Sequence, residues 1–107
     1  MTGSDELYPI YQQPQQLETA ADILQERGSR YGKFMDQAAV SVALKKIMQT
    51  SPNWNSLSPD QREALEMNCV KASRILVGDP NYVDNWRDIE GYAKLVADRL
   101  EREIHEF

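Results

Sequence analysis

The chain has 107 residues, which is enough for one domain and too short for a second hydrophobic core. Its net charge of −5 disfavours the broad, sequence-independent binding to nucleic acid that depends on a basic surface. No run of about eighteen apolar residues occurs, so we expect no membrane-spanning helix. The N-terminus lacks the basic head and apolar core of a secretory signal, and the single cysteine excludes an internal disulfide. These features predict a cytoplasmic protein.

The order of apolar and polar residues predicts an all-α fold, a four-helix antiparallel bundle that follows a flexible N-terminal arm. Residues 1–15 contain two of the five prolines and no apolar periodicity, so we assign them to the arm and residues 16–107 to one helical domain. A first helix is expected over residues 17–27, where apolar side chains recur at helical spacing. Gly28 is its expected end, because glycine readily adopts the left-handed conformation that closes a helix.

The second expected helix, residues 34–48, is apolar on two opposite sides. Met35 and Val42 belong to one side, and Leu44 and Ile47 belong to the other. A helix with two apolar sides is usually sandwiched between partners, so we expect either a central position in the bundle or a subunit interface. Because a chain of this length has few elements to cover so many apolar sides, the pattern favours a homodimer.

The last two helices are expected on either side of a short break at residues 78–81, which makes them antiparallel neighbours. The third helix is expected to begin with Ser58 as N-cap, Pro59 at the first helical position and Gln61 completing a capping box. It extends to Val77. The fourth runs from residues 82–84 to 104, and its expected core stripe consists of Trp86, Ile89, Ala93, Val96, Ala97 and Leu100.

Charged residues that can form a site are concentrated in these two helices. Paired acids can hold a divalent cation, and the candidates are Glu63, Glu66, Asp84 and Asp88. Two bases of the third helix, Lys71 and Arg74, can hold a phosphate. In an antiparallel register about the break, these bases face Asp84 and Asp88, whereas Glu66 lies about 9 Å farther along at roughly 1.5 Å per residue. This register favours a structural salt-bridge network, and a metal site would need acids from another helix or another protomer.

A second group of bases surrounds the glycine-containing turn after the first helix. Arg27, Arg30 and Lys33 flank Gly28 and Gly32. Backbone amides freed by glycine can receive an anion together with these cations. The same bases can instead face the negative end of the helix dipole, and both interpretations stay open.

Several motifs of the chain form a pattern over residues 25–100. They are Arg30-Tyr31-Gly32, Lys71-x-x-Arg74, Gly78-Asp79-Pro80 and Asp84-x-x-x-Asp88-Ile89-x-Gly91-Tyr92-Ala93. This pattern resembles a small phage and prophage domain family of unassigned function. More remotely, Glu63-Ala64-Leu65-Glu66 is similar to the Glu-x-x-Glu motif of the all-α nucleoside triphosphate pyrophosphohydrolases of the MazG and dimeric dUTPase type. The chain departs from their second motif, Glu-x-x-Asp, because Asp84 and Asp88 are four residues apart.

The resemblance implies a phage-encoded nucleotide-binding protein of the host cytoplasm that releases pyrophosphate from a nucleoside triphosphate with Mg²⁺ as cofactor. By this resemblance Glu66 and Asp88 would be catalytic, Glu63, Glu66, Asp84 and Asp88 would hold the metal, and Lys71, Arg74, Arg30 and Lys33 would bind the phosphates. The alternative is a non-enzymatic acidic phage accessory protein that binds and inhibits a host protein, such as a nuclease or a defence complex.

Overall fold

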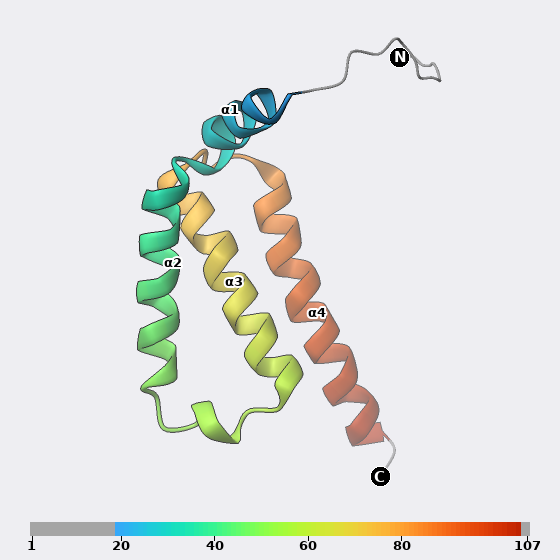
Figure 1. The fold of residues 1–107 in the computed structure, drawn as a ribbon. Helices are drawn as coiled ribbons and strands as arrows, with labels where there is room; N and C mark the ends of the chain where they lie inside the picture. Colours follow the sequence, from blue (N-terminus) through green and yellow to red (C-terminus); the bar gives the residue numbers. More distant parts are fainter. Residues whose placement is uncertain (1–18, 106–107) are drawn as a thin grey trace, which may run out of the picture.

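The computed structural model describes residues 19–105, and every regular element in this part of the chain is helical (Figure 1). The elements are α1 (Ala20–Tyr31), α2 (Phe34–Gln49), the short 3-10 helix η1 (Trp54–Ser56), α3 (Pro59–Val77) and α4 (Val83–His105). The all-α prediction is therefore confirmed, whereas the expected N-terminal arm, residues 1–15, lies outside the described residues. None of the described helices has the length and apolarity that crossing a membrane requires.

Local hydrogen bonds set the two ends of α1. The Thr19 hydroxyl accepts the backbone N–H of Asp22 at 3.0 Å, and the Asp22 carboxylate accepts the backbone N–H of Thr19 at 3.3 Å. The helix continues through Gly28, its predicted end, to Tyr31. Gly32 then ends the helix with a φ of 82°, the left-handed conformation that glycine adopts most easily. The predicted end was therefore wrong because the second of the two glycines takes this conformation.

The predicted limits of α3 are confirmed. The helix begins at Pro59, and the backbone N–H of Ser58 donates to Gln61 Oε1 at 3.0 Å, as a capping box requires. It ends at Val77, immediately before Gly78. The short break then reverses the chain, so that α4 runs antiparallel to α3 (Figure 1).

The three long helices form one open layer, so the expected arrangement as a four-helix antiparallel bundle is not confirmed (Figure 1). α3 is the middle helix and packs against α2 on one side and α4 on the other. α1 crosses the end of the layer where α2 begins and α3 ends, because the chain turns sharply at Gly32. Gly78 fits closely against the backbone of Arg30 and Tyr31, and Asp79 N–H donates to the Arg30 carbonyl at 2.8 Å. These contacts hold α1 across the layer.

The layer buries little apolar surface. Among the described residues, the buried apolar side chains are those of Ala64 and Cys69. The buried polar or charged residues are Gln37, Ser41, Lys71, Ser73 and Asn85. Polar groups therefore take positions that larger apolar side chains occupy in most domain cores.

The core stripe predicted for α4 is only partly buried. Ile89 and Val96 are half-buried, but Trp86 is 53% exposed, and Ala93 and Ala97 are exposed as well. α4 packs against α3 on one side only, and no other described helix covers the rest of its apolar stripe. The stripe is therefore partly exposed.

Candidate anion-binding site

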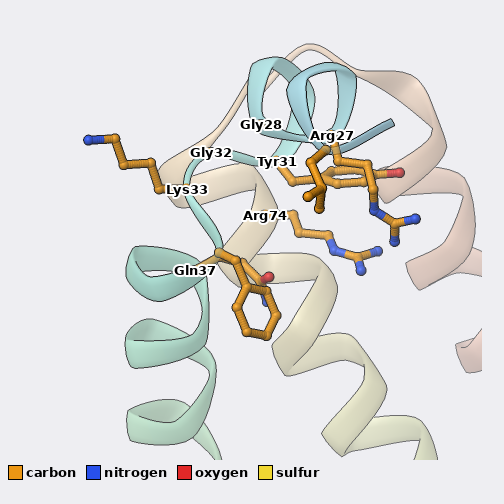
Figure 2. Close-up of a pocket in the computed structure, with 9 residues that line it drawn as sticks. Arg27, Gly28, Tyr31, Gly32, Lys33, Gln37 and Arg74 are labelled. Atoms are coloured by element: carbon orange, nitrogen blue, oxygen red, sulfur yellow. The ribbon is translucent and has the colours of Figure 1, made fainter. Parts of the chain in front are cut away.

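A pocket of about 430 Å³ opens where α1 meets the start of α2 and the last turns of α3 (Figure 2). It is lined by Leu24, Arg27, Gly28, Tyr31, Gly32, Lys33, Phe34, Gln37 and Arg74. Three of these residues are cationic, and none of the described residues that line the pocket is anionic. Because the chain as a whole carries a charge of −5, the pocket is a local reversal of charge that suits an anion.

Tyr31 positions two arginines in the pocket. The guanidinium carbon of Arg74 lies 4.3 Å from the centre of the Tyr31 ring, and that of Arg27 lies 5.7 Å away. Stacking of this kind occupies the flat face of a guanidinium and leaves its N–H edge able to donate to an anion. Figure 2 shows both guanidinium groups on the same side of the pocket. The Nε of Arg74 is buried and has no hydrogen-bond partner in the described part of the chain.

A second stack joins α1 to the start of α4. The Arg30 guanidinium carbon lies 4.4 Å from the centre of the Tyr82 ring, and the rings of Tyr82 and Tyr31 meet edge to face at 6.0 Å. The Tyr82 hydroxyl donates to Asp84 at 2.8 Å, and this hydrogen bond raises the pKa of Tyr82 above its ordinary value. Arg30, a predicted phosphate ligand, therefore packs on Tyr82 beside the pocket and is not among the residues that line it.

A buried hydrogen-bond chain fixes α2 against α3 next to the pocket. The side-chain amide of Gln37 donates to the hydroxyl of Ser73 at 3.0 Å, and this hydroxyl donates to the Val70 carbonyl at 2.6 Å. Ser73 is fully buried. These hydrogen bonds fix the distance between α2, which holds Gln37, and α3, which holds Arg74. The pocket between them is therefore preformed.

Two other predicted phosphate ligands are placed differently. Lys71 Nζ forms an ion pair with Asp88 Oδ2 at 2.9 Å, which confirms the register predicted for α3 and α4. The Lys71 side chain is only 11% exposed, so its charge is already matched inside the layer. Lys33 lines the pocket, but Figure 2 shows its side chain pointing away from the two arginines. Of the predicted set, only Arg74 directs its charge into the pocket.

The four predicted metal ligands are not gathered at one place in a single chain. Glu66 accepts a hydrogen bond from Gln49 Nε2 of α2 at 3.3 Å, whereas Asp88 is bound to Lys71 on the α4 side of α3. Asp84 accepts the Tyr82 hydroxyl, and Glu63 is exposed on α3. Within residues 19–105, no group of three or more His, Cys, Asp or Glu residues is arranged to hold a metal ion.

The role of the two tyrosines was not predicted from the sequence. Tyr31 follows Arg27 by one helical turn, and this i, i+4 spacing is a local signal for a cation stacked on a ring. The signal is easily overlooked when a helix is expected to end at Gly28, because Tyr31 then falls in a turn. The contact with Arg74 has no local signal, since it depends on how α1 crosses α3.

The fold and the pocket define this chain as an all-α protein with a preformed cationic site. No protein-family model, no curated protein and no solved structure matches it.

Proposed function

We propose that this protein binds the phosphate groups of a nucleotide in the pocket between α1, α2 and α3. The observation that carries the proposal is the pair of Arg27 and Arg74, stacked on one tyrosine in a pocket that no acidic residue of the described chain lines. Arginine offers a planar fork of N–H donors that matches phosphate oxygens, and such charge-assisted hydrogen bonds are about twice as strong as neutral ones. The Arg74 side chain lines the pocket, and its guanidinium supplies terminal N–H donors for a phosphate oxygen.

The rest of the pocket suits the nucleoside part of the ligand. Leu24 and Phe34 line it with apolar surface, and Phe34 is 77% exposed. Stacking of a base on an aromatic ring contributes about 1–3 kcal/mol, so an exposed phenyl group beside two arginines favours a nucleotide over a bare phosphate. The volume of about 430 Å³ falls within the usual range for small-molecule sites.

Hydrolysis with Mg²⁺ is the further activity that the sequence resemblance implies, and one chain does not fit it. Glu66 and Asp88 contact different neighbouring helices, and the described residues contain no cluster of three potential ligands. A metal centre would therefore need carboxylates from a second copy. Nucleotide binding, without a metal-dependent step, is therefore the function that the residues of a single chain support.

The alternative, binding to a host protein through acidic side chains, is supported by the net charge of −5 and by exposed acids such as Glu63 and Glu90. It makes an opposite prediction about the pocket. An acidic docking surface would not depend on Arg74, and nucleotides would have no effect on it.

The proposal is tested by calorimetric titration of the full chain with nucleoside mono-, di- and triphosphates, with inorganic phosphate and pyrophosphate as separate arms. We expect nucleotides to bind, and Arg74→Gln to weaken binding about tenfold or more, because it removes a bidentate charged contact. Arg87→Gln is the matched control, since Arg87 is an exposed arginine of α4 that pairs with Glu90 at 2.9 Å outside the pocket.

Three results would contradict the proposal. They are no binding of any nucleotide, equal affinity of wild type and Arg74→Gln, or a loss in Arg87→Gln as large as that in Arg74→Gln. Tight binding of pyrophosphate with no gain from a nucleoside would reduce the site to an inorganic anion site. A parallel assay of pyrophosphate release in the presence of Mg²⁺ separates binding from hydrolysis.

A further inference from the structure

One side of the layer formed by α2, α3 and α4 is apolar and open, and we call it the apolar face. Its large side chains come from all three helices, and they are Ile47, Leu65, Leu76, Trp86, Leu100 and Ile104. Ile47 and Leu76 are each 68% exposed. Isolated exposed apolar residues are common, but a set that spans one side of three packed helices is a candidate interface.

The apolar face contains a groove of about 380 Å³ between α3 and α4. Leu65 and Asn68 line it from α3, and Ala97 and Leu100 line it from α4. The cationic pocket lies on the opposite side of the layer. Arg74 is nine residues from Leu65, which is half a turn beyond two full turns, so it lies on the other side of α3. The cationic pocket therefore stays accessible when the apolar face is covered.

A single chain leaves the apolar face without a covering layer. Among the described residues, Ala64 and Cys69 are the buried apolar side chains, whereas all six large side chains of the apolar face are exposed. A second layer packed on this face would therefore bury apolar surface that one chain cannot bury.

The polar group in the groove points to the occupant. Asn68 is the tenth of the 19 residues of α3, so it stands at the midpoint of the central helix. The residue is half-buried and lines the groove. A carboxamide carries both an acceptor and donors, so the accessible part of Asn68 can pair with the same group of a second copy across a two-fold axis, as a single asparagine does when it sets the register of paired helices.

We propose that the apolar face is the interface of a homodimer whose two-fold axis passes beside Asn68. Each layer covers the other, and the two layers together enclose the core that a single chain lacks. The proposal does not depend on nucleotide binding, because the pocket lies on the other side of α3.

The test is the mass of the full chain by sedimentation at micromolar concentration, where we expect twice 12.3 kDa. Ala97→Glu places a charge in the groove and should raise the dimer dissociation constant about tenfold or more. Leu95→Glu is the matched control, because Leu95 is on the same helix, 69% exposed, and borders Arg87 and Asp88 on the opposite side. This variant should remain dimeric.

The axis is tested by a cysteine in the centre of α3. Asn68→Cys combined with Cys69→Ala leaves one thiol per chain, and mild oxidation should link two chains, since a disulfide needs Cα atoms within about 7 Å. If Ala97→Glu fails to fold, this variant decides alone. A monomeric wild type, dissociation by Leu95→Glu in place of Ala97→Glu, or no cross-link in Asn68→Cys would overturn the proposal.

Discussion

At the scale of single residues, Asp60 and Arg99 form the tightest charged contact between α3 and α4. Arg99 donates from Nε to Asp60 Oδ2 at 3.0 Å and from a terminal nitrogen to Oδ1 at 2.7 Å, and it also donates to the Ser58 hydroxyl at 2.7 Å. The hydrogen bond from Arg99 is the main reason why the pKa of Asp60 falls from 3.8 to about 2. This contact joins the first turn of α3 to the later part of α4, at the opposite end of the layer from the pocket.

The lowered pKa predicts a specific acid sensitivity. Because the folded state binds the proton of Asp60 less tightly than the unfolded chain does, the contact stabilises the fold above a pH of about 3.8. The contribution is lost as the pH falls towards 2. Urea unfolding between pH 2 and 5, followed by circular dichroism, should show less loss of stability in Asp60→Asn than in the wild type.

NMR titration of the Asp60 carboxyl provides the direct control. We expect a midpoint near 2 in the wild type and a return towards the ordinary value of 3.8 in Arg99→Gln. An ordinary midpoint in the wild-type protein would show that the bidentate contact does not persist in solution.

At the scale of elements, the crossing of α1 over α3 is what creates the pocket. Gly32 is the pivot, because its positive φ turns the chain and its Cα lies against the end of α3, where a Cβ would be 2.8 Å from the Val77 carbonyl oxygen. Gly28, four residues earlier, is an ordinary helical position, and a Cβ there would meet no described atom within 4 Å.

The two glycines therefore predict opposite effects of the same substitution. Gly32→Ala should lower the free energy of unfolding by about 2 kcal/mol, because an L-residue is strained in the left-handed region and the methyl group meets Val77. Gly28→Ala should raise it by about 0.5–1 kcal/mol, because alanine has the better helix propensity. Chemical denaturation of both variants checks the pair, and equal effects would contradict the assigned helix end.

The helix ends show what the sequence can and cannot predict. Ser58, Pro59 and Gly78 act on their immediate neighbours, so the limits of α3 follow from local chemistry. Gly28 and Gly32 are equally able, as glycines, to end a helix. The tertiary contact of Gly32 with Val77 decides which of them ends α1. Likewise, the periodicity of the sequence predicts the apolar stripe of α4. It does not predict which side of α4 is buried, because that depends on how the helices are arranged in the layer.

At the scale of the whole molecule, the candidate site combines one predicted interaction with one that was not predictable. The pairing of Lys71 with Asp88 followed from the antiparallel register of two helices joined by a short break. The meeting of Arg27 and Arg74 at Tyr31 did not, because no pattern within one helix encodes the direction in which α1 crosses another. The structural ion pair of Lys71 and Asp88 therefore lies inside the layer. The arginines proposed to bind the ligand, Arg27 and Arg74, lie in the pocket.

The most direct test of the proposed site follows the Nε–H signals of the arginines by NMR while a nucleoside triphosphate is added. The account predicts that the signals of Arg27 and Arg74 move together and saturate, while that of Arg87, outside the pocket, stays in place. Signals of Arg27 and Arg74 that do not respond, or a response confined to other arginines, would contradict it.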